Sequence, residues 1–205
     1  CIYVIDIQDR KRLGESLSYL KDVIEKFKEL ELEDVSIDIF FHKMDPKYVK
    51  EHGSEQVLRE VNDLKEKIEA IVNKAFNVHY HKTTIRSLWS IISSFSEILL
   101  RIYPQSEFLD KSLEEFADKI SPCNGILILD NNSLIIGHYY RDSRSKVVLK
   151  NSLPCFFTLN DSLVNSGETS ENVEMVVRRG ENVFYFDTFK IKSIEEPLYL
   201  LIMSP

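Results

Sequence analysis

The sequence lacks the features that define several large classes of protein. Its 205 residues contain no apolar run near the roughly 20 residues of a membrane-spanning helix, and no secretory or lipidation signal is recognisable. Acidic residues outnumber basic ones by 33 to 26, and the net charge of −7 argues against a nucleic-acid surface. The three cysteines, Cys1, Cys123 and Cys155, form no CxxC pair, which favours free thiols in a reducing compartment.

Glycine is also scarce, and no phosphate-binding loop is present. The six glycines are scattered, and none belongs to a GxxxxGK[ST] motif. No Ser-His-Asp or Cys-His signature is recognisable in the sequence, so no catalytic residue is predicted. His79 and His81 alternate and would share one face of a strand, but no third ligand accompanies them. No metal site is therefore predicted.

What remains is an ordinary globular composition, with 43% hydrophobic and 29% charged residues in a length that allows one large or two modest domains. Its most informative stretch is an apolar segment, residues 35–41, that ends in His-Lys-Met-Asp at residues 42–45. Pro46 prevents the strand from continuing. Ligands of open α/β sheets bind just beyond such strand ends.

A carboxylate fixed at a strand end can accept two hydrogen bonds from a planar pair of donors. Guanine offers such a pair, its ring N–H and its exocyclic amino group, and adenine does not. Asp45 is therefore predicted to select guanine, because the wrong base leaves a polar group unpaired. The alternative interpretation is an aspartate that caps a turn at the end of the strand.

Three segments together resemble one protein family. His-Lys-Met-Asp resembles the fourth guanine-recognition motif of small GTPases, usually Asn-Lys-x-Asp, and histidine in the first position is the form found in the Rag/Gtr family. Residues 81–89, His-Lys-Thr-Thr-Ile-Arg-Ser-Leu-Trp, are similar to the fifth motif, Thr-Ser-Ile, running into a helix. Residues 2–7, Ile-Tyr-Val-Ile-Asp-Ile, resemble the strand before the third helix of the family.

The resemblance implies a set of guanine-binding residues: His42, Lys43, Asp45, Thr83, Thr84 and Ile85. Asp45 would accept two hydrogen bonds from the base, the methylene groups of Lys43 would lie along the base, and His42 would make one hydrogen bond. The 83–85 loop would present backbone N–H groups to the guanine carbonyl oxygen, and Thr84 also fits a helix N-cap. GTP or GDP is the implied cofactor. Mg²⁺ would bind in the full-length parent through residues that are not in this chain.

Hydrophobic periodicity predicts an α/β fold for residues 1–103. Strands are predicted at residues 2–7, 35–41 and 77–81, and helices at 10–31, from about 54 onward, and at 85–102. The strands and helices alternate, and residues 46–54 are predicted to be a loop. Right-handed crossovers make the strands parallel. With the resemblance, this part is expected to be the C-terminal half of a Ras-like doubly wound P-loop NTPase domain. The phosphate loop and both switches would precede Cys1, so the chain is expected to be truncated at its N-terminus.

Residues 104–106 break the pattern and are predicted to be a domain boundary. The elements expected beyond it are a helix at 107–120, a hairpin with a two-residue turn at Asn131-Asn132, a helix at 144–165 interrupted at Pro154, and strands at 173–178, 183–190 and 198–203. This order resembles the roadblock/longin-like domain that follows the nucleotide domain in Rag/Gtr proteins. That domain is assigned to residues 107–205.

The helix periodicities also predict which side chains face inward. The predicted set, helix by helix, is Leu13, Leu17, Leu20, Ile24, Phe27 and Leu30; Leu58, Val61, Leu64, Ile68, Ile71 and Ala75; Leu88, Trp89, Ile92, Phe95 and Leu99; and Phe108, Leu109, Leu113, Phe116 and Ile120.

Three hypotheses about function stay open. The first is a Rag/Gtr-like guanine-nucleotide-binding switch subunit, whose parent binds and hydrolyses GTP while this chain alone binds it weakly or not at all and is inactive. The second is a nucleotide-free scaffold that dimerises through the roadblock/longin-like domain. A phosphate-loop motif encoded upstream of Cys1 would favour the first. The third is a longin-type trafficking adaptor in which His-Lys-Met-Asp is accidental.

The resemblance also implies partners. They are a second Rag-like GTPase subunit or a second copy of the chain, roadblock scaffold proteins, and TOR kinase complexes. Neither nucleic acid nor direct membrane insertion is expected. The implied location is the cytoplasm, including the surface of the lysosome or vacuole when the protein is held there by its partners.

Overall fold

The computed structural model describes residues 1–32, 35–103, 106–165, 174–191 and 196–205. They form two compact units, Cys1–Ser94 and Phe95–Pro205, which are described separately. The division falls within helix α4 (Leu88–Ile102). In the second unit the Ile135 N–H donates to Ser96 Oγ of this helix at 3.0 Å. The predicted boundary at 104–106 lies partly outside the described residues, so the domain limits of 1–103 and 107–205 stay a prediction.

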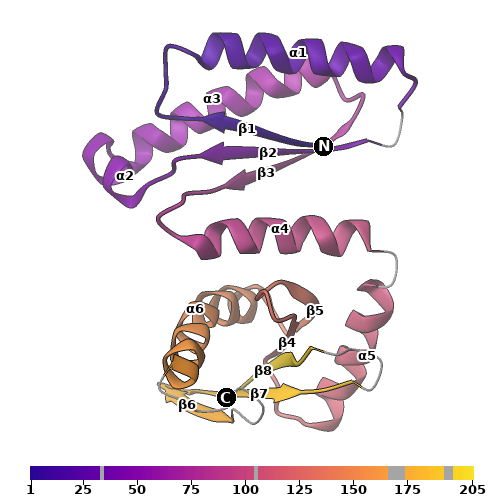
Figure 1. Cartoon of the computed structure of the whole chain (residues 1–205), viewed down its shortest axis with the longest axis vertical. Coiled ribbons are helices and arrows are strands. Elements are labelled where there is room, and N and C mark those ends of the chain that lie inside the picture. Colours follow the sequence, from indigo (N-terminus) through magenta and orange to yellow (C-terminus); the bar gives the residue numbers. More distant parts are fainter. Residues whose placement is uncertain (33–34, 104–105, 166–173, 192–195) are drawn as a thin grey trace. The chain divides into compact units, whose positions relative to one another are not determined.

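The first unit is a three-stranded parallel sheet in the order β1-β2-β3, with α1 and α3 on one face (Figure 1). Its elements are β1 (Ile2–Asp6), α1 (Leu13–Glu29), β2 (Ser36–His42), α2 (Pro46–His52), α3 (Ser54–Val72) and β3 (Asn77–Lys82). The predicted alternation of parallel strands and helices is confirmed. Parallel sheets bury hydrophobic strands, which explains the nearly continuous apolar character of β2.

The core of this unit lies between the sheet and the two helices. Alternate residues of β2 (Ile37, Ile39 and Phe41) are fully buried there. Helix α3 contributes a buried stripe with helical spacing: Val57, Val61, Leu64, Ile68 and Val72. Each such side chain contributes about 1.5–3 kcal/mol of burial free energy. This packing holds the carboxyl end of β2 in a fixed position.

The opposite face of the sheet contains a buried polar pair. His81 Nε2 lies 2.8 Å from Asp38 Oδ1, and both side chains are buried. His81 therefore pairs with a carboxylate of the neighbouring strand. Among the described residues, no group of three or more His, Cys, Asp or Glu side chains is placed to hold a metal ion.

The second unit is a five-stranded antiparallel sheet in the order β5-β4-β8-β7-β6 (Figure 1). Besides the end of α4, its elements are α5 (Ser106–Lys119), β4 (Gly125–Leu129), β5 (Ile135–Tyr140), α6 (Ser143–Asn165), β6 (Met175–Arg179), β7 (Asn182–Phe189) and β8 (Leu198–Ser204). The predicted order of helix, hairpin, helix and three strands is confirmed. The start of the strand predicted over 173–178 lies outside the described residues.

The two helices of the second unit pack on different faces of its sheet. Leu113 of α5 belongs to a cluster with Ile126 of β4. Phe156 of α6 stacks on Phe186 of β7, with ring centroids 5.4 Å apart, and Phe186 stacks in turn on Tyr199. The fold is therefore mixed α/β in both units, as expected.

Two connections differ from the prediction. Residues 46–52 form a helix, because Pro46 at its first position has its φ already set for a helix and loses no needed donor. The connection of the first hairpin spans residues 130–134 instead of a two-residue turn. Asp130 Oδ1 accepts the N–H groups of Asn132 and Leu134 there, and the positive φ falls on Ser133.

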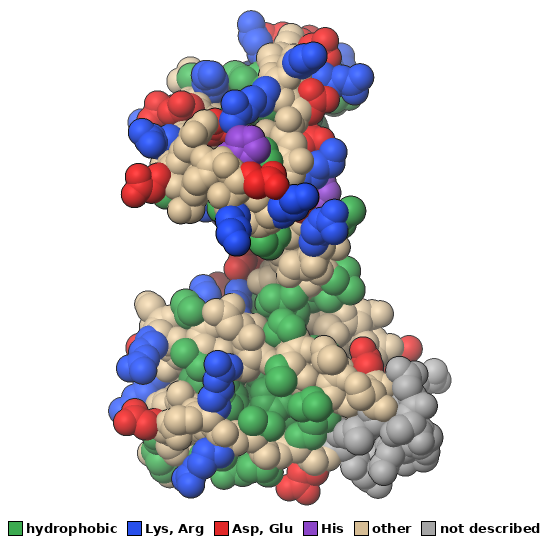
Figure 2. Space-filling model, turned by 90° about the vertical axis from the view of Figure 1, so that its left-hand side faces the viewer, with side chains coloured by type: hydrophobic (Ala, Val, Ile, Leu, Met, Phe, Trp, Pro, Cys, Tyr) green, Lys and Arg blue, Asp and Glu red, His purple; other side chains and the backbone are tan. Residues whose placement is uncertain are grey.

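Several predictions of inward-facing side chains were wrong. Leu88 is 67% exposed and Phe108 is 77% exposed. Leu30, Leu58, Ala75, Phe95, Leu99 and Phe116 are exposed too, and Trp89 and Ile92 are half-buried. Periodicity shows that a helix has an apolar stripe, but neighbouring elements decide which part of that stripe is covered. Figure 2 shows hydrophobic side chains gathered on the displayed face of the second unit.

All three cysteines are free thiols, as predicted. Within the part of the chain that the structure describes, no helix has both the length and the apolar character needed to cross a bilayer.

Candidate functional site

The three parallel strands of the first unit bring their carboxyl ends to one edge of the sheet. Asp6 at the end of β1 pairs with His42 at the end of β2, and Phe41 pairs with Lys82 at the end of β3. The segments that follow the strands therefore lie together. This is the edge where ligands bind in open α/β sheets.

The 42–45 and 83–85 loops are joined by backbone hydrogen bonds. The Met44 N–H donates to the Thr83 carbonyl, and the Thr83 N–H donates to the Phe41 carbonyl, each at 3.0 Å. His42 Nδ1 lies 3.0 Å from Thr83 Oγ1, and Thr83 is fully buried. The predicted residues of the two motifs are thus brought together, with His42 and Thr83 linking the loops.

Asp45 accepts hydrogen bonds from two other segments. It occupies the N-cap position of α2, yet its carboxylate makes no capping hydrogen bond. The Thr84 hydroxyl donates to its Oδ1, and Gln8 Nε2 donates to its Oδ2 at 3.2 Å. Each carboxylate oxygen has two lone pairs, so one acceptor position on each oxygen remains available beside a half-buried side chain.

Thr84 is itself held in place within its loop. Its N–H donates to Ser90 Oγ at 3.0 Å, and its Oγ1 accepts the Arg86 N–H at 3.1 Å. Helix α4 begins at Leu88, so Thr84 is not the N-cap of that helix. Ile85 is 75% exposed. Thr84 is therefore oriented toward Asp45 rather than toward the helix.

Lys43 has a left-handed backbone conformation, with φ of +63°. Its Nζ lies 2.5 Å from Asp6 Oδ2. Burial raises the pKa of Asp6, but hydrogen bonds from Lys43 and from the Gln8 N–H outweigh this effect and hold that pKa below its ordinary value. The hydrogen bond and charge of Asp6 raise the pKa of Lys43. Both groups are thus held in their charged forms.

Sequence reasoning missed three residues of this site: Asp6, Gln8 and Ser90. Asp6 and Gln8 lie at the end of β1 and just beyond it, and the rule that parallel strands end at one edge could have identified them. Ser90 is indistinguishable in sequence from its neighbouring serines at Ser87, Ser93 and Ser94. Only the fold places it against Thr84.

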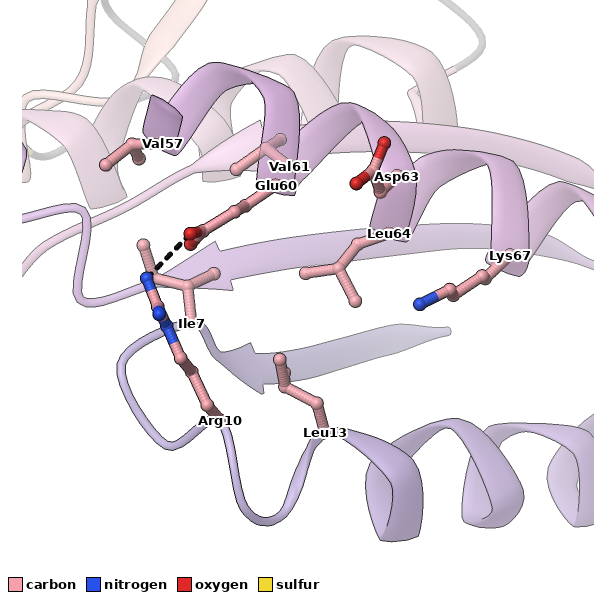
Figure 3. Close-up of a pocket in the computed structure, with 9 residues that line it drawn as sticks. All are labelled: Ile7, Arg10, Leu13, Val57, Glu60, Val61, Asp63, Leu64 and Lys67. Atoms are coloured by element: carbon pink, nitrogen blue, oxygen red, sulfur yellow. Dashed lines mark hydrogen bonds and ion pairs between the residues drawn. The ribbon is translucent and has the colours of Figure 1, made fainter. Parts of the chain in front are cut away.

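A pocket of about 280 Å³ lies between α1 and α3 in the same unit, and Figure 3 shows its lining. Its apolar side chains come from Ile7, Leu13, Val57, Val61 and Leu64. Its charges balance, because Arg10 and Lys67 are matched by Glu60 and Asp63, and Arg10 Nη2 lies 2.6 Å from Glu60 Oε1 (Figure 3). None of the predicted guanine-binding residues lines it. A balanced pocket of this kind offers no preference for an anionic nucleotide.

Comparison with known proteins adds independent information. A family model described as the Gtr1/RagA G protein conserved region matches residues 1–156. No curated protein matches the chain. Among solved structures, MglB from Myxococcus xanthus is similar with a TM-score of 0.32 and 12% sequence identity, covering 48% of this chain and 68% of that one.

Proposed function

Because the chain belongs to the Gtr1/RagA family of G proteins, we propose that its first unit reads the guanine base of GTP or GDP for a Rag-like switch protein. The reading set is His42, Lys43, Asp45, Thr83, Thr84 and Ile85. Asp45 accepts the ring N–H and the exocyclic amino group. The loop at 83–85 faces the guanine carbonyl oxygen.

The observation that supports this proposal is which groups donate hydrogen bonds to the Asp45 carboxylate. An aspartate at an N-cap position ordinarily accepts backbone N–H groups of its own helix. Asp45 makes no such bond, and Thr84 and Gln8 donate to it from two other segments. A carboxylate held from outside its own helix, half-exposed at the ligand-binding edge of a parallel sheet, suits recognition better than capping.

Base reading alone supplies selectivity but little affinity. Most affinity for a nucleotide comes from its phosphates, which the family binds with a glycine-rich loop and Mg²⁺. The 205 residues contain no such loop motif. We therefore expect this chain alone to bind GTP weakly or not at all and not to hydrolyse it.

The second unit, which includes the proposed roadblock/longin-like domain at 107–205, is proposed to pair with another subunit through the edge at β6. At the other edge, strand β5, two N–H groups are already paired: those of Ile135 and His138 donate to Ser96 Oγ and Asp110 Oδ1. Strand β6 is the remaining edge, and Val176 on it is 56% exposed. An edge strand that presents an exposed apolar side chain favours strand pairing between chains.

The partner proposed for this edge is a second Rag-like subunit or a second copy of the chain. Roadblock scaffold proteins and TOR kinase complexes are further partners that membership of the family would imply. A cytoplasmic location, including recruitment to the lysosomal or vacuolar surface, would follow as well. The scaffold hypothesis shares the β6 edge and differs only in having no nucleotide.

Binding of GDP and ADP separates the two hypotheses. Isothermal titration would be run on the 205-residue chain and on the complete product of its gene. The switch hypothesis predicts that the gene product prefers GDP over ADP by at least about a hundredfold, because the wrong base leaves Asp45 unpaired. Equal affinities, or no binding by the gene product, would leave the scaffold hypothesis in place.

A further inference from the structure

The segment after β1 contacts both charged residues of the His-Lys-Met-Asp loop, although it belongs to neither guanine motif. Gln8 Nε2 donates to the Lys43 carbonyl at 2.8 Å and to Asp45 Oδ2 at 3.2 Å. The Gln8 N–H donates to Asp6 Oδ1 at 3.0 Å, while Asp6 Oδ2 pairs with Lys43 Nζ. Gln8 is thus placed by Asp6 and held on two atoms of the neighbouring loop.

The chemistry of these contacts fixes the orientation of the Gln8 amide. A carbonyl oxygen and a carboxylate oxygen only accept hydrogen bonds, so the nitrogen of the amide must face both. One of its hydrogens supports the left-handed backbone of Lys43, which for a residue other than glycine costs about 1–2 kcal/mol. The other occupies one lone pair of Asp45. Thr84 occupies a lone pair of the other carboxylate oxygen.

We propose that Gln8 is a specificity-determining residue of the guanine site, a role that rests on the proposed function. It acts by positioning Asp45. With Thr84 on one oxygen and Gln8 on the other, the plane of the carboxylate is set, and one acceptor position on each oxygen is left for the base. Because Thr84 and Gln8 both donate to residue 45, a carboxylate satisfies both contacts, whereas an amide has only one oxygen to accept them.

The requirement for an acceptor makes the role testable, because the effect of replacing Gln8 should depend on which residue stands at position 45. In Gln8→Glu, a carboxylate would face the Asp45 carboxylate and the Lys43 carbonyl, and the carboxylate plane would no longer be held. Combined with Asp45→Asn, the same substitution offers an acceptor to the amide introduced at position 45. If the contact merely stabilised the fold, the loss of affinity would be the same in both backgrounds.

The experiment measures GDP and xanthosine diphosphate affinities of the complete gene product by competition with a fluorescent nucleotide. Xanthine carries a carbonyl where guanine carries its amino group, so it suits an amide at position 45. Gln8→Glu in the wild-type background is expected to weaken GDP binding about tenfold or more. In the Asp45→Asn background it is expected to weaken xanthosine diphosphate binding clearly less, because only the Lys43 carbonyl then opposes the new carboxylate. Gln56→Glu, the same change on an exposed side chain of α3, serves as the control and should alter neither affinity.

The outcomes separate the two proposals. If the gene product binds GDP and Gln8→Glu leaves that affinity within about twofold, the role of Gln8 is overturned and the proposed function stands. A similar loss in both backgrounds also overturns the role, because it indicates general disruption of the loop. If the wild-type gene product binds no guanine nucleotide, the proposed function fails and the role of Gln8 fails with it. Thermal unfolding of each variant shows whether a loss reflects misfolding.

Discussion

Replacing Asp45 tests the base-reading geometry most directly. The carboxylate has one acceptor position left on each oxygen, since Thr84 and Gln8 occupy the others. Guanine would use both positions. Hydrogen bonds to a charged acceptor contribute about 1.5–3 kcal/mol each, so two of them amount to about 3–6 kcal/mol. Asp45→Ala is therefore expected to weaken GDP binding about 10²- to 10⁴-fold.

Asp45→Asn separates loss of the carboxylate from loss of the side chain. An amide keeps one acceptor for the ring N–H and presents a donor where guanine also has a donor. GDP binding should fall nearly as far as in Asp45→Ala, while xanthosine diphosphate, with an acceptor at that place, should bind better than GDP. The preferred base should therefore change from guanine to xanthine.

The assay is titration of the complete gene product with each nucleotide, together with thermal unfolding. Asp45→Ala also removes the acceptor of the buried Thr84 hydroxyl, which costs about 1–3 kcal/mol of stability, so folding must be checked. Asp63→Ala removes the same charge from an exposed position on α3 and serves as the control. A folded Asp45→Ala variant with GDP affinity within about threefold of wild type would refute the reasoning.

Three further predictions concern stability and assembly. The pKa of Asp6 is lowered in the folded state, so its contribution to the free energy of unfolding is complete above its unfolded pKa of about 3.9 and is lost as pH falls through the folded pKa. Asp6→Asn should therefore reduce the dependence of that free energy on pH below about 3.9, as measured by urea unfolding, and an unchanged dependence would contradict this. Ile39 is fully buried, so Ile39→Ala should lower the free energy of unfolding in urea by about 2–5 kcal/mol. Val4 is 58% exposed, so Val4→Ala should lower it by less than about 0.5 kcal/mol, and equal losses would argue against the placement of the core. In an antiparallel edge strand alternate N–H groups point outward, so one of the two variants Val176→Pro and Val177→Pro removes only an outward N–H group. That variant should abolish association between subunits in sedimentation experiments without loss of stability, and association that persists in both variants would exclude β6 as the interface.

Much of the first unit was predictable because its determinants are local. Residues 35–41 are apolar and stop at a proline, so strand β2 and its end follow from burial and from the geometry of Pro46. Parallel pairing then follows from the helices between the strands. The closeness of the 42–45 and 83–85 loops needs no further information, since parallel strands end at the same edge.

The helices show where local determinants stop. An apolar stripe predicted burial of Leu88 and Phe108, yet both are exposed, because burial requires a neighbouring element at that part of the stripe. The helix at 46–52 was missed for the opposite reason. Its short segment carries no apolar period, and Pro46 starts it by conformation alone.

By itself, therefore, the sequence determined the α/β class, the order of elements in both units apart from helix α2, and the motif that carries Asp45. Hydrophobic period and turn chemistry act over a few residues, which is why these features could be predicted. Only the tertiary structure decided which donors hold the Asp45 carboxylate, since Gln8 and Thr84 lie 37 and 39 residues away along the chain. It also showed that side chains of α4 and α5 accept two N–H groups of β5, and that β6 is the other edge of the second sheet. Such contacts depend on where packing places a side chain, and no local pattern records that position.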